Sequence, residues 1–261
     1  MADDKSSFEE ALQEAQELGL AESDPTMDID GTDAAQKATI LSALAFNTPF
    51  DFTSVSYGGI ESVSPEDIKY AEQLGYSIKH IAYGSLDGNE ANISAFPTFV
   101  PKDQLLSQAG QQMNALEVHC EGIGSTVYYG PGAGPQPTAS AVIADLVDIS
   151  NGGWPESSNE KNKNILSKDG NQIFTRYFNL EVKNEAGAIA KLSTLFAEEN
   201  ISIEALIQKE SKQNNENQPY VPVVIISGPL TDKQASEMKN NLESTPETNQ
   251  KVKQFRIHNV I

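Results

Sequence analysis

The second half of the chain alternates strand-like and helix-like segments in an order that points to one fold. From residue 174 onward, runs rich in β-branched and aromatic residues alternate with amphipathic stretches. The predicted elements are, in chain order, strand Phe174–Val182, helix Gly187–Glu199, strand Ile201–Glu210, strand Tyr220–Ser227, helix Thr231–Leu242 and strand Val252–Val260. This βαββαβ order predicts a ferredoxin-like domain.

A polar segment separates this domain from the first half of the chain. Residues 151–172 contain glycines and polar residues without periodicity, which is typical of a linker. Residues 1–150 combine strand-like runs with helical patterns, one of which starts at Ser64-Pro65 and ends at Gly75. They predict a mixed sheet with helices on one face. The predicted class is therefore α+β, with a first domain at 1–150 and a second at 173–261.

The charge of the chain excludes several kinds of partner. A net charge of −19 argues against binding to nucleic acid or to an anionic membrane surface. No apolar run approaches the ~18 residues of a membrane span, and the N-terminus does not resemble a signal peptide, so we expect a cytoplasmic protein.

The single cysteine, Cys120, lies in a strand-like stretch where we expect a buried, inert thiol. No metal site is predicted.

An acid–lysine pair occupies an unusual place on a predicted helix. Gly31 and Thr32 open a helical pattern that runs to about Phe46. Asp33 and Lys37, at i, i+4 spacing, project into the same stripe as the apolar residues Ile40, Leu41, Leu44 and Ala45. Such a pair is usually a surface contact worth about 0.2–0.5 kcal/mol. The apolar neighbours favour instead an inward-facing pair, and buried charge pairs concentrate at functional sites.

The segment around this pair resembles the signature of an enzyme family. The run from Ala15 to Pro25, followed at fixed spacing by Asp28, Gly31, Asp33 and Lys37, resembles the signature of homoserine dehydrogenase. The run Tyr129–Val142 resembles the glycine-rich segment that closes the catalytic part of that family. The two resemblances cover about residues 6–150. They imply the NAD(P)-dependent interconversion of L-homoserine and L-aspartate 4-semialdehyde, in the biosynthesis of threonine and methionine.

The resemblance also implies roles for individual residues. Lys37 is the proton-transferring residue, and Asp33 orients it. Glu22 and Asp28 hold the amino and hydroxyl groups of L-homoserine, although each acid taken alone is more typical of a solvated loop. A second lysine used by the family lies upstream and is not assigned in this sequence.

The glycine-rich run contains the candidate cofactor-proximal residues Gly130, Gly132, Ala133 and Gly134. It is not a P-loop, because no Lys-Ser/Thr follows, and Pro135 replaces the third glycine of a dinucleotide fingerprint. A nucleotide site of its own is thus the weakest interpretation. The run is either a tight turn into a helix at Thr138–Ile149 or, by resemblance, a segment that packs on a dinucleotide-binding domain near the cofactor.

Family members begin with a dinucleotide-binding domain, and no strand, Gly-x-Gly-x-x-Gly turn and helix precede residue 20 here. We therefore expect a C-terminal portion of the enzyme, whether an expression truncation, a proteolytic product or a split gene. NAD or NADP is implied for the full-length protein, and no cofactor is expected on this portion alone. The alternative is a non-catalytic amino-acid-binding regulatory or oligomerisation protein.

Two segments of the second domain resemble the ACT regulatory domain, Asn184–Ile189 after the first strand and Asn200–Ile203 after the first helix. In that family, backbone amides at the helix start hold the carboxylate of a small amino acid. The resemblance implies L-threonine as the effector, bound at Asn184, Gly187 and Ala188. Ala186 stands where the family usually has proline, and a plain oligomerisation domain is the alternative. Either interpretation predicts a homo-oligomer, a dimer or larger.

Overall fold

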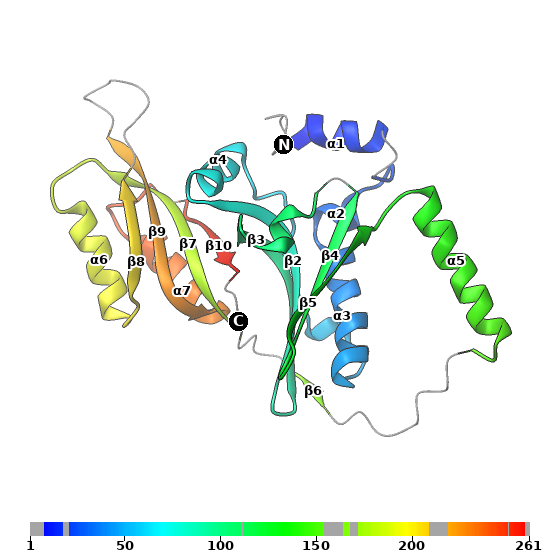
Figure 1. Ribbon diagram of the computed structural model, residues 1–261. Helices are drawn as coiled ribbons and strands as arrows, with labels where there is room; N and C mark the ends of the chain where they lie inside the picture. Colours follow the sequence, from blue (N-terminus) through cyan, green and yellow to red (C-terminus); the bar gives the residue numbers. More distant parts are fainter. Residues whose placement is uncertain are drawn as a thin grey trace. The chain divides into compact units, whose positions relative to one another are not determined.

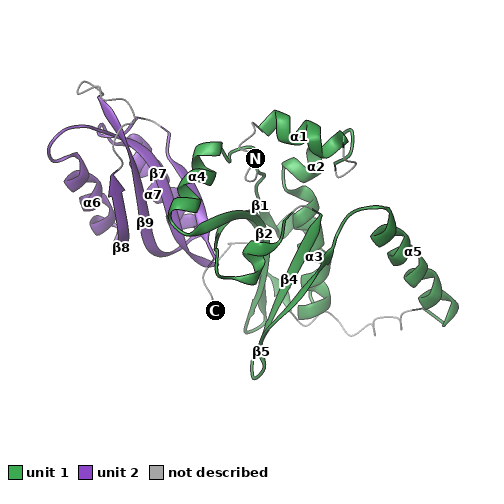
Figure 2. Cartoon of the chain, turned by 45° about the horizontal axis from the view of Figure 1, so that its top comes forward, with its two compact units in different colours: residues 1–168, 261 green, residues 169–260 purple. Residues whose placement is uncertain are grey.

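The computed structural model describes residues 8–17, 21–110, 112–153, 164–167, 172–208, 219–249 and 251–258. The chain forms two compact units, residues 1–168 with 261 and residues 169–260 (Figure 2). Much of the predicted linker, residues 154–163 and 168–171, lies outside the described residues. Within the linker, Ile165–Leu166 forms a short strand, β6.

The described residues of the first unit form helices, a small mixed sheet and a separate ribbon made of β4 and β5 (Figure 1). Its helices are α1 (Phe8–Glu17), α2 (Thr26–Ile29), α3 (Thr32–Phe46), α4 (Pro65–Gln73) and α5 (Pro135–Ser150). Its longer strands are β2 (Tyr76–Asp87), β3 (Glu90–Pro101), β4 (Met113–Cys120) and β5 (Gly124–Pro131). Its described residues also form the short strand β1 (Ser56–Tyr57) and the 3-10 turns Phe52–Ser54 and Leu105–Gln108.

Strand β3 organises the sheet of the first unit. It pairs antiparallel with β2 along the whole length of both strands and parallel with β1 and β6. Helix α3 packs on β2 and β3, and α4 packs on β2. A small core lies beneath α3, formed by Ala35, Ala38, Val55, Ile93 and Ala95.

Two predictions about local structure have opposite outcomes. The helix start at Ser64-Pro65 is confirmed: Ser64 caps α4, and its backbone N–H donates to the Asp67 carboxylate at 2.9 Å. The buried thiol is wrong, because Cys120 is exposed. Among the described strands β4 pairs with β5 alone, so the end of this ribbon has no sheet to cover it.

The second unit has the predicted ferredoxin-like topology. Its elements are β7 (Ile173–Lys183), α6 (Ala188–Glu198), β8 (Ile203–Gln208), β9 (Tyr220–Thr231), α7 (Asp232–Ser244) and β10 (Lys253–Ile257). The strands lie in the order β10-β7-β9-β8, and all neighbours are antiparallel. Phe178 of β7 meets Phe196 of α6 edge to face, with ring centroids 5.8 Å apart, in a core that also buries Leu192, Ile225 and Met238. The predicted α+β class is thereby confirmed.

Candidate active site around the α2–α3 turn

Helix α3 brings the acid–lysine pair together one helical turn apart. Gly31 caps α3 with a φ of +87°, a left-handed conformation that favours glycine. Asp33 lies in the first turn of α3, and Lys37 follows one turn later. The Lys37 Nζ lies 2.6 Å from the Asp33 Oδ2, so the carboxylate fixes the position of the amine.

The prediction that this pair faces inward is wrong. The Lys37 side chain is 63% exposed and that of Asp33 is 37% exposed. The large residues of the same stripe, Ile40, Leu41 and Leu44, are also exposed. Helix α3 instead turns its small residues toward the sheet, and the buried ones are Ala35, Ala38, Thr39, Ser42 and Ala43. Small side chains allow the helix to approach the sheet closely, which leaves the apolar stripe and the charged pair on one open face.

The acids of this region divide into two groups. Asp24 accepts hydrogen bonds from the backbone and the hydroxyl of Thr26, and these bonds lower its pKa. Asp30 accepts from the backbone of Thr32 at 2.8 Å. Among the described residues, the exposed carboxylates of Glu22 and Asp28 have no hydrogen-bond or ion-pair partner. Two acids therefore hold the turns, and the two that the resemblance selects are left open to a ligand.

A pair of glycines that the sequence analysis did not select holds this turn against the sheet. The Gly58 N–H donates to the Ala95 carbonyl of β3 at 2.9 Å, and the Ile60 N–H donates to the Ile29 carbonyl at 2.9 Å. A Cβ atom on Gly59 would overlap the Ile29 carbonyl oxygen and lie 2.7 Å from the Asp30 Cα. Only glycine allows the backbones to approach this closely.

Replacement of Gly59 tests this contact. Gly59→Ala is expected to lower the free energy of unfolding by about 3 kcal/mol, because the new methyl group meets backbone atoms that must shift. Urea unfolding of the chain measures the loss. The matched control is Gly110→Ala, since a Cβ at Gly110 has its nearest neighbour at 4.0 Å. Equal stabilities of the two variants would contradict the close contact.

The glycine-rich run forms a tight turn into α5. The Gly132 N–H donates to the Gln112 carbonyl at 2.9 Å, and a Cβ on Gly132 would overlap the amide of Asn114. Gly134 caps α5 with a φ of +110°. Helix α5 then exposes Val142, Ile143, Leu146, Val147 and Ile149. The geometry accounts for Gly132 and Gly134 as parts of a turn, and it leaves a long helix with an exposed apolar surface.

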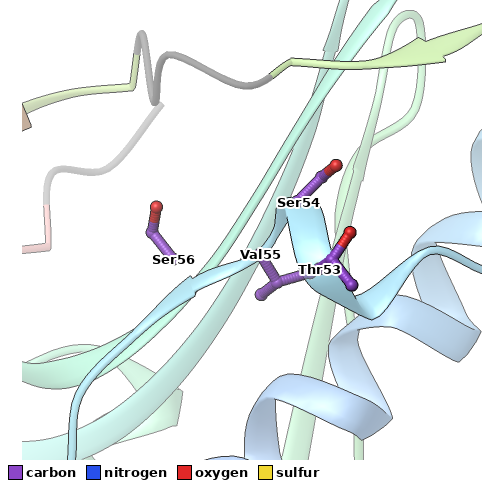
Figure 3. Close-up of a pocket in the computed structure, with 4 residues that line it drawn as sticks. All are labelled: Thr53, Ser54, Val55 and Ser56. Atoms are coloured by element: carbon purple, nitrogen blue, oxygen red, sulfur yellow. The ribbon is translucent and has the colours of Figure 1, made fainter.

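A shallow hollow lies elsewhere in the first unit. Thr53, Ser54, Val55 and Ser56 line a volume of about 260 Å³, and Figure 3 shows the three hydroxyl groups among them. No predicted site residue takes part in it. The described residues contain no group of His, Cys, Asp and Glu suited to a metal ion, and none of their helices has the length and apolarity of a membrane span.

The candidate effector residues lie at the start of α6. Gly187 caps the helix with a φ of +92°, so its conformation explains the glycine. The backbone N–H groups of Asn184 and Ala188 already donate to the carbonyls of Pro219, at 2.9 Å, and Glu185, at 3.2 Å. A ligand there would have to use the remaining amides of this turn.

An ion pair joins the effector region to the loop after α7. Lys191 of α6 pairs with Glu247, whose backbone carbonyl also accepts from the Lys183 N–H at 2.8 Å. The Lys191 ammonium and the Thr245 hydroxyl lower the pKa of Glu247 to about 2. This loop is thereby bound to the end of β7 and to the first turns of α6, which flank the segment where the effector is expected.

Comparison with known proteins agrees with both resemblances. Residues 1–147 match the homoserine dehydrogenase family, and residues 176–237 match the ACT domain. The homoserine dehydrogenase of Neisseria gonorrhoeae is 41% identical over 80% of this chain, and that of Bacillus subtilis is 36% identical over 93%. A homoserine dehydrogenase structure from Thiobacillus denitrificans superposes with a TM-score of 0.89 at 33% identity and covers all of this chain.

The chain is much shorter than these proteins. It spans 50% and 56% of the two curated relatives and 60% of the chain in the solved structure. The matched share contains the Asp33–Lys37 pair and most of the second unit.

Proposed function

Because the chain belongs to the homoserine dehydrogenase family, we propose that it supplies the substrate-binding and regulatory parts of an enzyme that interconverts L-homoserine and L-aspartate 4-semialdehyde. The observation that carries this proposal is the 2.6 Å contact between the Lys37 Nζ and the Asp33 carboxylate. The proposal places the reaction in the cytoplasm and in a homo-oligomer.

The pair can perform the proton transfer that this reaction needs. Oxidation of an alcohol removes a hydride from carbon and a proton from oxygen, and NAD or NADP accepts the hydride when it is bound. Lys37 as the neutral amine takes the proton from the substrate oxygen, and as the ammonium it gives a proton to the alkoxide in the reverse reaction. Asp33 keeps the amine in one orientation through their ion pair. Glu22 and Asp28 bind the ammonium and hydroxyl groups of L-homoserine.

The open apolar surfaces of the first unit fit an enzyme that another part completes. Ile40, Leu41 and Leu44 on α3 continue the stripe that carries Lys37, and α5 exposes a second apolar surface. Exposed aliphatic surface of this extent is typical of an interface. We infer that the dinucleotide-binding domain of the complete enzyme covers these helices. The segment of Gly130, Gly132, Ala133 and Gly134 then lies near the cofactor.

The test of the function is an assay of the chain joined to the dinucleotide-binding domain of a curated relative. The proposal predicts that this protein reduces NAD or NADP only when L-homoserine is present. The alternative, a non-catalytic regulatory protein, predicts no reduction and the binding of a small amino acid.

The second unit is proposed to bind L-threonine between two copies, near Asn184, Gly187 and Ala188. Residues 174–261 are expected to fold alone and to self-associate, because their six elements complete one core. Calorimetric titration with L-threonine is expected to release heat. Asn184→Ala keeps the backbone N–H but removes the polar side chain beside the proposed site, and it is expected to weaken binding about tenfold or more. Lys251→Ala, at an exposed position outside the strands and helices, is the matched control.

Three results would count against this proposal. The first is that L-threonine releases no heat when titrated into the whole chain. The second is that Asn184→Ala and Lys251→Ala bind L-threonine equally well. The third is that residues 174–261 sediment as a monomer. Any of them favours an oligomerisation domain or a site elsewhere.

A further inference from the structure

We propose that His80 is a positioning residue of the candidate site: its ring and the Gly58 carbonyl together hold Gly31, the cap of the helix that carries Asp33 and Lys37. This inference rests on the proposed function, because it assigns a task to a residue through that site. His80 was not selected by the sequence analysis, and it does not touch the reacting groups itself.

The contact joins three segments that are distant in the sequence. The His80 Nε2 lies 3.0 Å from the Gly58 carbonyl oxygen. A Cβ atom on Gly31 would lie 2.9 Å from the His80 Cε1 and 2.9 Å from the same carbonyl oxygen. The ring, the carbonyl and the helix cap therefore meet at one point, and no side chain fits between them.

Two of the three segments are fixed by the sheet. His80 belongs to β2 and pairs with Pro97 of β3. Gly58 is bound to β3 through its hydrogen bond to Ala95. The cap at Gly31 is the part that can be displaced, and Asp33 follows it by two residues. A shift at this cap moves the carboxylate that orients Lys37.

The chemistry of the contact specifies the protonation of the ring. A carbonyl oxygen only accepts, so the His80 Nε2 must carry a hydrogen. Burial lowers the pKa of His80 below its usual value, while the bond to Gly58 and the charge of Asp33 oppose that shift. Asp33 is the charged group of α3 whose negative charge raises the pKa of His80. The neighbouring Lys79 donates its ammonium hydrogen bond to the Ala109 carbonyl. The ring is therefore neutral at pH 7 and close enough to Asp33 to sense its charge.

Nitrogen NMR of the ¹⁵N-labelled chain tests this contact without any need for activity. The chain has 3 histidines, and the His80 signals are those that His80→Gln removes. We expect the Nε2–H form and a pKa below the usual 6.5. Asp33→Asn is expected to lower that pKa further, since it removes a negative charge. Absence of the Nε2–H form, or a pKa that Asp33→Asn leaves unchanged, overturns the inference.

The same contact predicts a pH dependence of stability. The folded pKa of His80 lies below the unfolded value, so the unfolded chain binds the proton first as the pH falls. Stability is therefore expected to fall as the pH drops below about 6.5 and to do so less in His80→Gln. Urea unfolding at pH 7.5 and 5.5 measures this difference, and equal pH dependence in both proteins counts against it.

Kinetics of the joined enzyme test the positioning role. His80→Leu fills similar space but cannot donate, and it is expected to lower kcat about tenfold or more with a smaller change in KM. His80→Gln can donate to Gly58 through its amide and is expected to recover most of the loss. Unchanged kcat in His80→Leu overturns the role, as does the absence of rescue in a folded His80→Gln. If the enzyme does not oxidise L-homoserine, the proposed function fails, whereas the NMR titration still decides the contact.

Discussion

In the joined enzyme, Lys37→Ala is expected to lower kcat by about 100-fold or more, which is the usual loss on removing a general acid or base. The free energy of unfolding is expected to change little, because the Lys37 side chain is 63% exposed and a surface ion pair contributes only about 0–1 kcal/mol. Steady-state kinetics and urea unfolding of the same preparations separate the two effects. The matched control is Lys102→Ala, an exposed lysine of the first unit.

The companion variant isolates the role of the carboxylate. Asp33→Asn keeps the shape of the side chain and removes the charge that lies 2.6 Å from the Lys37 Nζ. It is expected to lower kcat as well, because the amine loses the partner that orients it. Near-normal kcat in both variants would mean that the pair is a plain surface contact and that the reaction takes place elsewhere.

The fold was largely predictable because its signals are local. The strand and helix order after residue 174 predicts the ferredoxin-like topology, since each element carries its own periodicity. The start of α4 was equally clear, because Ser64, Pro65 and Asp67 meet the requirements of a helix cap within four positions.

The orientation of α3 was not predictable in the same way. Periodicity shows that Ile40, Leu41 and Leu44 share a face with Lys37, but it does not say what covers that face. Helix α3 packs on the sheet through the face that carries its small residues, such as Ala35 and Ser42. The apolar stripe is therefore exposed, and the rule that apolar residues face the nearest core failed here.

The contact around Gly31 was missed for a different reason. It joins the α2–α3 turn to Gly58, Gly59 and His80, which lie far along the sequence. Contacts between such distant residues depend on the register of β2 against β3, and the periodicity of the sequence does not predict that register. The adjacent glycines at 58 and 59 were the available signal, since paired glycines often mark a close approach of two backbones.

The central claim is that this chain carries the substrate and proton-transfer groups of an enzyme completed by a dinucleotide-binding domain. One measurement tests it most directly: reduction of NAD or NADP with L-homoserine by the chain alone and by the chain joined to that domain. The joined protein is expected to turn over at an ordinary rate of about 1–1000 per second, whereas the chain alone is expected to show no turnover. Turnover by the chain alone at such a rate, or none by a folded joined protein, would contradict the account.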